Sequence, residues 1–439
     1  MKFKLTSTQQ NFFTNNPFLD RTLWNFGAIQ FFNEKYTYKQ LNDVLNLLVE
    51  NHENLRMRIS KNDDTFYSHI EDFHYVDFPL IQASSFEELT KTTQDYVNAP
   101  IDFDGELVKC MSFTTPDCSG FFIYAHHIVF DGFGAQLMIR YLNNALKGQK
   151  TYFGDLESYE NYIKKEDEYK QSKRYNRDKK FWEEQFSTEL ICDVVLQGRK
   201  NVDYTSSELN GSLSSESFVK IKKFCDENEI SLNSFFDAIC SIYISRKYEV
   251  ENFTLGVPVL NRTTLAEMNT IGLYMHILPL VCNMESVSFA EFAKQTEENK
   301  LNLFRHQKFT QTDIKELLKE KGIEKNNLFD VAFSYQDFAP NENYEILFQY
   351  SNALSIPLEI HLQNFNDEEH NLKIRYRTAY FNEAEVQTML NSIIAIAEDA
   401  VENPDKIIYE LEMISSEEKQ KILRNFNETA YTYDIPENT

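Results

Sequence analysis

The sequence predicts an α/β protein built from more than one lobe. Helix-type patterns of apolar residues alternate along the chain with short runs of aromatic and β-branched residues, as is typical of helices packed on sheets. The 439 residues would fill about three domains of ordinary size, and two large lobes are also allowed. Hydrophobic residues make up 42% of the chain and aromatic residues 14%, which excludes a largely disordered protein.

The first half of the chain predicts helices and strands in alternation. Thr37 and Gln40 form a capping-box pattern at the start of the first helix. The expected elements are helices over 38–51 and 133–147 and strands over 55–59 and 120–130. A strand, an Asp-Gly turn and a helix therefore follow one another between residues 120 and 147.

A change of composition marks the middle of the chain. Residues 155–185 are rich in Tyr, Lys, Glu and Asp, which predicts a solvated helix that joins two lobes. This segment holds a basic cluster of Lys164, Lys165, Lys170, Lys173, Arg174, Arg177, Lys179 and Lys180. The cluster is either an ordinary exposed helix face or a docking surface.

The second half repeats the alternation of strands and helices. Strands are expected over 253–262, 271–280 and 329–338, a hairpin around 366–371, and a helix over 382–402. Asn382 and Glu385 stand at the start of that helix and Pro404 just beyond its end. The tail, residues 414–439, predicts a short helix followed by an extended segment.

Charge and composition exclude several classes of protein. The formal net charge is −24, from 44 basic and 68 acidic side chains, whereas a nucleic-acid-binding protein needs a dominant basic face. No apolar run approaches the ~18 residues of a membrane span, and the N-terminus lacks the apolar core of a signal peptide. We therefore expect a cytoplasmic protein with no nucleic-acid partner and no membrane span.

The cysteines predict neither disulfides nor a metal site. They are Cys110, Cys118, Cys192, Cys225, Cys240 and Cys282. No two have the close spacing of a metal-binding knuckle or a redox pair, and a chain of this size does not need disulfides to fold. We expect reduced thiols that are mostly buried.

One short segment combines residue types that suit acyl transfer to an amine or hydroxyl. His126 and His127 precede Asp131 and Gly132 in the pattern HHxxxDG. Neighbouring residues of a strand face opposite ways, so one histidine can enter a cleft while the other packs. An imidazole with a pKa of ~6.5 can accept a proton near pH 7. Asp131 could cap the following helix, or pair with an arginine and hold the loop.

Other chemistries are not indicated. No serine elbow or cysteine signature accompanies the histidines, so a covalent acyl-enzyme is not suggested. The two histidines are adjacent rather than four residues apart, and no HExxH pattern occurs, so no metal is expected. No glycine-rich phosphate-binding loop is present either, which argues against ATP chemistry within this chain.

The HHxxxDG pattern at 126–132 resembles the active-site motif of the condensation domains of nonribosomal peptide synthetases. Further segments resemble motifs of that family in the same order. They are LTSTQQNFF at 5–13, NHENLRMRI at 51–59, YENYIKKEDEY at 159–169, KKFWEEQF at 179–186, TIGLYMHILPL at 270–280, RHQKF at 305–309 and LFDVAFSYQDF at 328–338. The resemblance therefore covers nearly the whole chain.

The resemblance implies two lobes like chloramphenicol acetyltransferase, arranged as a V-shaped pseudo-dimer with an active-site tunnel between them. The N-terminal lobe would be residues 1–170. The C-terminal lobe, with a loop that crosses between the lobes, would be residues 171–413. Residues 414–439 would be a linker towards an adenylation domain.

The resemblance also implies roles for residues of the motif. His127, beside His126, would accept a proton from the acceptor α-amine, or position it, as it attacks the donor thioester. Asp131 would be structural and paired with Arg56, because Asn51 stands where the family's other arginine is usual. Gly132 would allow a tight turn and bring a backbone N–H towards the oxyanion.

The substrate tunnel has weaker candidates. Asn261 and Arg262 lie in the inferred crossing loop and would line the cleft or form a plain turn. His276 stands where the family usually has Asn, and it would either touch the tunnel or pack on its strand. Ser334 and Gln336 would line the tunnel. Gln336 would reach the donor side, and Tyr335 would either do so or pack in the core. The domain itself would bind no cofactor, because the substrates are carried on 4′-phosphopantetheine of carrier proteins, or on acyl-CoA as donor.

The type of condensation domain is predicted from finer similarities. HHIVFDGFG, PVLNR and GLYMHILPL are similar to starter domains that N-acylate the first amino acid of a lipopeptide or siderophore. The partners would be a donor acyl carrier protein or acyl-CoA, a downstream acceptor peptidyl carrier protein and an adenylation domain. An elongation domain that joins two aminoacyl or peptidyl carriers is the main alternative.

Three other interpretations are weaker. A stand-alone CoA-dependent acyltransferase would carry a DFGWG motif, which is absent from the sequence. A catalytically silent carrier-binding module would not need the intact His127, Asp131 and Gly132. An α/β protein with a merely buried pair of histidines would not show the ordered series of motifs.

Overall fold

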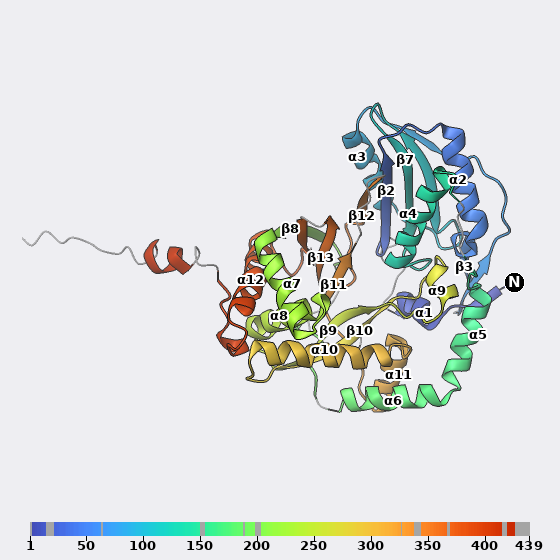
Figure 1. Ribbon diagram of the computed structural model, residues 1–439. Coiled ribbons are helices and arrows are strands. Elements are labelled where there is room, and N and C mark those ends of the chain that lie inside the picture. Colours follow the sequence, from blue (N-terminus) through green and yellow to red (C-terminus); the bar gives the residue numbers. More distant parts are fainter. Residues whose placement is uncertain are drawn as a thin grey trace, which may run out of the picture.

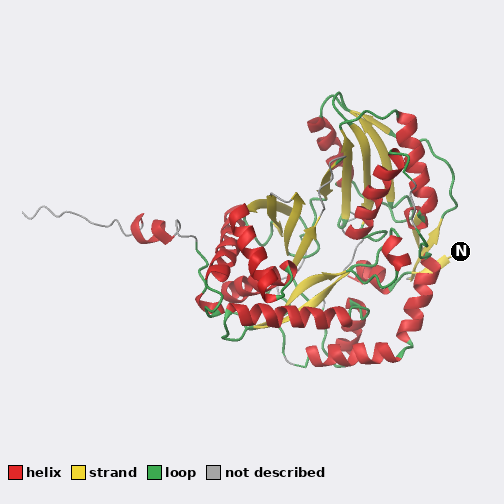
Figure 2. Cartoon of the chain, in the orientation of Figure 1, coloured by secondary structure: helices red, strands yellow, loops and turns green. Residues whose placement is uncertain are grey.

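The computed structural model shows two lobes with a connection of two helices running around their outer side (Figures 1 and 2). It describes residues 2–14, 22–62, 65–149, 154–187, 189–197, 203–325, 327–337, 344–366, 369–414 and 419–425. The expectation of an α/β fold in two similar lobes is confirmed. The domain boundaries expected at 170/171 and 413/414 remain predictions, and most of the expected linker lies outside the described residues.

The N-terminal lobe is built on a five-stranded sheet of order β12-β2-β7-β6-β5 and a small sheet of order β1-β4-β3. Its elements are β1 (Lys2–Lys4), α1 (Ser7–Thr14), β2 (Asn25–Phe32), α2 (Tyr38–Asn51), η1 (Glu53–Arg56), β3 (Met57–Asn62), β4 (Thr65–Ile70), β5 (Leu80–Gln82), α3 (Phe86–Val97), β6 (Val108–Thr114), β7 (Ser119–His126) and α4 (Gly132–Leu146). The helix expected over 38–51 is confirmed, with the Thr37–Gln40 capping box at its start.

The segment after β7 differs from the strand expected over 120–130. The strand ends at His126, where the ring Nδ1 accepts a hydrogen bond from the Ile128 backbone N–H at 3.1 Å. Residues 127–129 then form a turn, and the side chains of Ile128, Val129 and Phe130 are buried in the core. Local side-chain bonding to the backbone therefore ends the strand early and places the helix α4 immediately after Asp131.

The C-terminal lobe is built on a six-stranded sheet of order β10-β9-β11-β13-β14-β8. Its elements are β8 (Ser206–Leu213), α7 (Ser215–Asn228), α8 (Leu232–Tyr248), β9 (Asn252–Val259), α9 (Leu265–Asn269), β10 (His276–Asn283), α10 (Phe289–Arg305), α11 (Gln311–Glu320), β11 (Val331–Asp337), β13 (Leu358–Asn366), β14 (Glu369–Arg377), α12 (Glu383–Glu402), η2 (Ile408–Glu410) and the π-turn η3 (Lys421–Asn425). The expected hairpin and the capped helix that follows it are confirmed.

The connection between the lobes is not one helix, as expected over 155–185, but two. They are α5 (Tyr159–Lys170) and α6 (Lys173–Gln185), which meet at a sharp corner in Figure 1. Ser172 begins the second helix by accepting a hydrogen bond from the Tyr175 N–H at 3.2 Å. A serine cap inside a charged run thus divides the predicted helix.

One strand of the second half belongs to the sheet of the first half. β12 (Glu345–Tyr350) pairs antiparallel with β2, from Glu345 opposite Phe31 to Tyr350 opposite Phe26. In Figure 1 it stands at the edge of the N-terminal sheet in the colour of the C-terminal part of the chain. The sequence pattern did not predict this strand, and residues 345–350 depart from the simple division into lobes.

Each lobe has its own hydrophobic core. One cluster of buried side chains runs from Leu5 to Ile163 and includes Ile271, and the other runs from Trp182 to Leu411. The six cysteines are buried and free, as expected. Over the residues that the structure describes, no helix has the length and apolar character needed to cross a bilayer.

Candidate active site

A cavity of about 400 Å³ lies between the lobes and is lined by both. Its apolar wall includes Phe12, Trp24, Phe26, Phe133, Leu273, Met275, Phe348 and Leu354. Its polar wall includes Ser334, Gln336, Glu359, His361 and Arg375. Of the predicted site residues, His127, Asp131, Gly132, His276, Ser334 and Gln336 line this cavity.

His127 is half-buried at the end of β7 and faces the cavity. Its ring stacks on Phe26 with centroids 4.3 Å apart, and its Nδ1 lies 3.2 Å from the Phe130 carbonyl oxygen. Since a carbonyl can only accept, Nδ1 carries the proton and Nε2 keeps a lone pair. Burial lowers the pKa of this imidazole below its ordinary value, although the Asp131 carboxylate opposes the shift. The ring is therefore a neutral base at pH 7.

His126 was predicted to belong to the catalytic group together with His127. In the structure its side chain points the other way and packs in the core. It is not among the described residues that line the cavity, and only 2% of its surface is exposed. Its ring packs edge-on against Phe12 and Phe103. Burial, with the neighbouring His127, lowers the pKa of His126 to about 3, so it stays neutral.

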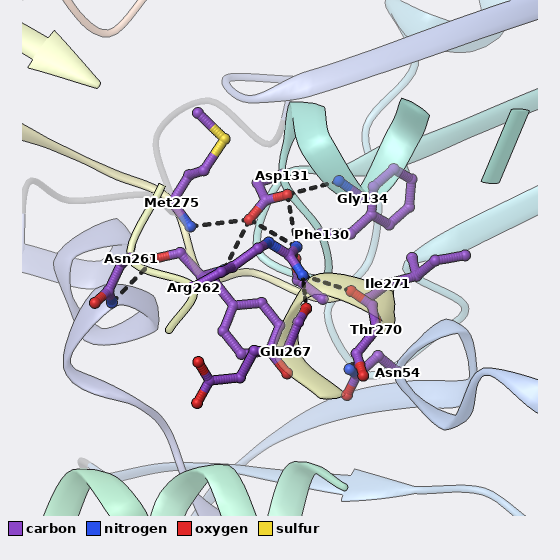
Figure 3. A network of polar contacts seen from close by, with 12 residues as sticks. Asn54, Phe130, Asp131, Gly134, Asn261, Arg262, Glu267, Thr270, Ile271 and Met275 are labelled. Carbon is purple, nitrogen blue, oxygen red and sulfur yellow. Dashed lines mark hydrogen bonds and ion pairs between the residues drawn. The ribbon is translucent and has the colours of Figure 1, made fainter. Parts of the chain in front are cut away.

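Asp131 is buried and joins the two lobes (Figure 3). Its Oδ1 caps α4 by accepting from the Gly134 N–H at 2.7 Å. Its Oδ2 accepts from the N–H groups of Tyr274 and Met275, both at 2.9 Å. Arg262 Nη2 donates to both carboxylate oxygens, at 3.0 and 3.2 Å. These contacts fix the loop after β7 against the loop before β10, so Gly272, Tyr274 and Met275 bond to Asp131 instead of extending the strand.

The prediction that Arg56 pairs with Asp131 is wrong, because Arg262 takes that place. The Arg262 guanidinium also donates to the backbone carbonyls of Glu267, Thr270 and Gly272 (Figure 3). It lies between the rings of Phe133 and Tyr274, 4.8 and 4.2 Å from their centroids.

Arg56 contacts the C-terminal turn of α2 instead of Asp131. Its guanidinium donates to the carbonyls of Val49, Glu50 and Glu71, so it satisfies carbonyls of the last turn of α2. Sequence reasoning considered only arginines in the motif near residue 51. The arginine that pairs with Asp131 lies 131 positions further along the chain.

Asn261 and Arg262 were expected in the substrate tunnel, but neither is among the described residues that line the cavity. Asn261 has φ 51°, and its side chain donates to the Tyr274 carbonyl at 3.3 Å. The two residues hold the crossing loop in shape. His276 lines the cavity and also packs, with Nε2 2.8 Å from the Gln307 carbonyl oxygen and Nδ1 3.3 Å from Thr8 Oγ1.

Gly132 is the first residue of α4 and lines the cavity. A Cβ added there would meet no atom within 4 Å, and its φ is not in the left-handed region, so the turn does not require glycine. Its N–H has no hydrogen-bond partner among the described residues, as is usual for the first turn of a helix. The positive end of the α4 dipole therefore faces the cavity.

The polar wall contains residues that sequence reasoning missed. Glu359, His361 and Arg375 come from β13 and β14, and nothing in their spacing along the chain marks them as a group. Arg375 Nη1 lies 3.3 Å from Glu359 Oε2, and its guanidinium stacks on Tyr350 with 4.6 Å to the centroid. Tyr350 stands opposite Phe26 in the β12–β2 pair. The side chains of Phe26, Tyr350 and Arg375 thus lie in sequence between His127 and the polar wall of the other lobe.

The basic cluster of residues 164–180 is largely neutralised within the chain. The ion pairs include Lys164–Glu160, Lys165–Glu157, Lys170–Asp313, Arg174–Asp178, Arg177–Asp178, Lys179–Glu320 and Lys180–Glu184. Two of them, Lys170–Asp313 and Lys179–Glu320, hold α5 and α6 against α11 of the C-terminal lobe. They favour the interpretation of this segment as a structural connection rather than a docking surface.

The family is decided by comparison with known proteins. A family model described as "Condensation domain" matches residues 2–423. The chain belongs to the condensation domain family. Condensation domains are acyltransferases that form amide bonds in nonribosomal peptide synthesis.

Curated relatives of this condensation domain are long synthetases. It is 26% identical over 405 residues to surfactin synthase subunit 1 of Bacillus subtilis (strain 168), covering 86% of this chain and 11% of that protein. It is 22% identical over 453 residues to gramicidin S synthase 2 of Aneurinibacillus migulanus, covering 98% of this chain and 10% of that protein. The condensation domain therefore spans a small fraction of the length of these relatives.

Solved condensation domains share the fold. The first condensation domain of the CDA synthetase matches with a TM-score of 0.79 at 16% identity, covering 94% of this chain and 99% of that one. The starter condensation domain of rhizomide synthetase RzmA matches with a TM-score of 0.77 at 14% identity, covering 94% and 100%. At these identities the likeness concerns the fold alone, and it supports the chloramphenicol acetyltransferase-like arrangement of the two lobes.

Proposed function

We propose that this condensation domain forms the amide bond between a donor acyl thioester and the α-amine of an amino acid held on an acceptor carrier protein, and that it acts as a starter domain. The observation that carries the proposal is the orientation of His127. Its Nδ1 is tied to the Phe130 carbonyl, and the ring lines a cavity shared by both lobes. Substrates entering from two sides would meet at Nε2.

His127 acts on the acceptor amine. The Nε2 lone pair accepts a hydrogen bond from the attacking amine and takes its proton as the C–N bond forms. A positioned base contributes ~10²–10⁴ in rate. Because a thioester is already activated, holding the amine against the carbonyl supplies a further part of the barrier reduction.

The first turn of α4 stabilises the developing oxyanion. Gly132 lies at the positive end of the helix and lines the cavity, and its N–H has no partner among the described residues. Backbone donors aimed at a developing negative charge are among the largest contributions to catalysis of acyl transfer. The carboxylate of Asp131 is already bonded to Gly134, Tyr274, Met275 and Arg262, so its role is to cap α4 and position His127 and Gly132.

The apolar wall of the cavity supports an acyl donor. Phe12, Trp24, Phe26 and Phe133 come from the N-terminal lobe, and β12 adds Phe348. Each methylene group of an acyl chain buried on such a surface is worth about 0.8 kcal/mol. We therefore propose a fatty or aryl acyl group as donor, presented by an acyl carrier protein or as acyl-CoA, in the first step of a lipopeptide or siderophore assembly line in the cytoplasm.

The test uses the purified chain with the aminoacylated downstream carrier and a panel of donors. Faster amide formation from octanoyl and aryl thioesters than from aminoacyl carriers is expected. The reverse preference would contradict the starter role and indicate an elongation domain. No product with any donor, from folded protein and loaded carriers, would indicate a catalytically silent carrier-binding module.

His127→Ala separates catalysis from folding. Amide formation should fall by ~10²–10⁴ while the circular dichroism spectrum stays the same. His69→Ala is the matched control, since His69 also lies near a carboxylate but is on the surface, 2.8 Å from Glu71 Oε1. Unchanged turnover in His127→Ala would contradict the assignment of His127.

A further inference from the structure

A serine, a histidine and a glutamate form a hydrogen-bonded row on the polar wall of the cavity. Ser334 Oγ lies 2.6 Å from His361 Nδ1, and His361 Nε2 lies 3.4 Å from Glu359 Oε2. Ser334 and His361 are direct partners across the parallel strands β11 and β13, and Glu359 is two residues before His361 on the same face. All three line the cavity.

The charges of the row fix the direction of its hydrogen bonds. Burial alone would raise the pKa of the Glu359 carboxyl, but its hydrogen bond to His361 and the charge of Arg375 hold the pKa below the ordinary value. An ionised carboxylate can only accept, so His361 Nε2 carries the proton and Nδ1 has the lone pair. The Ser334 hydroxyl therefore donates to His361 Nδ1, the arrangement of a serine poised for deprotonation.

A fourth side chain supplies a hydrogen-bond donor beside the serine. Gln336 Nε2 lies 3.5 Å from Ser334 Oγ. Its orientation is set by Gln363, whose Nε2 donates to Gln336 Oε1 at 2.7 Å. Gln336 Nε2 also lies 3.4 Å from His361 Nδ1. Its amide N–H is thus directed at Ser334 Oγ, where it stabilises the negative charge that develops on that oxygen as the proton leaves.

We propose that Ser334, His361 and Glu359 are a second reactive centre, which removes acyl groups from thioesters that are not consumed by the amine. Ser334 Oγ attacks the thioester carbonyl and its proton passes to His361 Nδ1. The C–S bond breaks, and the thiolate leaves with that proton as a free thiol. Water, activated by His361, then cleaves the Ser334 ester to a carboxylic acid and restores the hydroxyl. The choice of an acyl thioester as substrate rests on the function proposed above. The assignment of Ser334 as a nucleophile rests on its contacts with His361 and does not depend on that function.

Arg375 and Tyr350 support this centre without taking part in it. Arg375 holds Glu359 at 3.3 Å and donates to the Ser351 carbonyl at 3.2 Å, while Tyr350 stacks on its guanidinium. Because Tyr350 belongs to β12, which pairs with β2 of the N-terminal lobe, its stacking on Arg375 brings a strand of the N-terminal sheet against this centre.

The decisive experiment treats the full chain with an alkyl fluorophosphonate, which labels activated serines, and maps the label by peptide mass spectrometry. We expect the label on Ser334, none on Ser334→Ala, and labelling ~10²–10⁴ slower in His361→Ala. His69→Ala and Ser187→Ala are matched controls on the surface and should label as the unaltered chain does. All variants are checked for folding by thermal unfolding.

A second measurement follows thiol release from octanoyl-CoA in the absence of any amine. Release should be lost in Ser334→Ala and should yield octanoic acid. No label on Ser334 in the folded chain, or equal labelling in His361→Ala, would overturn the proposal and leave the row as a polar wall that only hydrogen-bonds the substrate. If amides form but Ser334 is not labelled, only the proposal of a second reactive centre is contradicted. If Ser334 is labelled but no amide forms, only the function proposed above is contradicted.

Discussion

Arg262 and Asp131 form a buried ion pair between two loops that belong to different lobes. Two contacts of 3.0 and 3.2 Å join them, and three backbone N–H groups share the same carboxylate. The aspartate of the HHxxxDG segment therefore links the two lobes through its ion pair with Arg262. His127 lies four residues before this aspartate.

The first prediction concerns this pair. Arg262→Met should destabilise the chain by about 3–5 kcal/mol, because it leaves the Asp131 carboxylate buried without its counter-charge. Amide formation should fall with it, since the loop that carries His127 loses its anchor. Arg56→Met is the matched control: it removes bonds to carbonyls of α2 and should leave amide formation by the folded protein close to that of the unaltered chain. Chemical denaturation and turnover measure both effects, and an equal loss of turnover in Arg56→Met would contradict the assignment.

The second prediction is the pH dependence of amide formation. His127 acts in its neutral form, and burial lowers its pKa below the ordinary 6.5. As pH decreases, kcat/KM for the acceptor should therefore fall when His127 is protonated, with a midpoint below pH 6.5. Protonation of the acceptor amine should cause a separate fall with a midpoint near pH ~7.7–8.0. Replacing the amine by a hydroxyl acceptor removes the second fall and isolates the first. A His127 midpoint above pH 6.5 would be inconsistent with this site.

The third prediction compares two glycines of the site. A Cβ at Gly272 would lie 2.8 Å from Asn54 Nδ2 and 2.9 Å from the Tyr274 ring, whereas a Cβ at Gly132 would meet nothing within 4 Å. Gly272→Ala should therefore cost about 1–3 kcal/mol of stability, as overpacking commonly does. Gly132→Ala should unfold at the same temperature as the unaltered chain. Thermal unfolding of the two variants side by side checks this, and a large loss in Gly132→Ala would show that the turn does need glycine.

The fourth prediction is a loss of stability in acid. Burial lowers the pKa of His126 to about 3 and that of His276 to about 4, from 6.5. Above pH 6.5 these rings are neutral in both the folded and the unfolded chain, and the stability is fully present. Below pH 6.5 the unfolded chain binds protons that the folded chain does not, so stability falls as pH decreases, by up to about 1.4 kcal/mol per pH unit for each histidine.

The acid loss can be assigned by substitution. His126→Asn keeps an acceptor for the Ile128 N–H but does not titrate. Between pH 4 and 6 its free energy of unfolding should therefore depend less steeply on pH, because about one proton fewer is bound on unfolding. His69→Asn is the control, because His69 is partly exposed, at 31% of its side chain. A slope unchanged by His126→Asn would mean that this ring is protonated in the folded chain.

Local patterns were sufficient to predict much of the fold. The capping boxes at Thr37 and Asn382 gave the starts of α2 and α12, because a cap is decided by residues three positions apart. The ordered motifs led to the two-lobe arrangement. The expected strand over 271–280 begins late because a distant group competes for its backbone: the N–H groups of Tyr274 and Met275 bond to Asp131.

The contacts within the candidate site were predicted only between residues that are close in the sequence, although His276, Ser334 and Gln336 were also predicted to line the cavity. His127, Asp131 and Gly132 could be found together, but the partner of Asp131 lies in another lobe and no spacing rule connects it to the motif. Ser334, His361 and Glu359 come together because β11 and β13 pair in parallel. That register is a property of the folded sheet and leaves no trace in the spacing of the residues.

The crossing strand β12 also determines when the N-terminal sheet can be completed during synthesis. Tyr350 pairs with Phe26, 324 positions earlier, so the edge of β2 lacks this strand while the intervening chain is made. At about 5–20 residues per second, that interval is on the order of 15 to 65 seconds. An open edge of this kind readily pairs with other chains. Nascent chains therefore expose this edge until β12 (Glu345–Tyr350) leaves the ribosome, and truncation before residue 345 should leave an N-terminal lobe that aggregates.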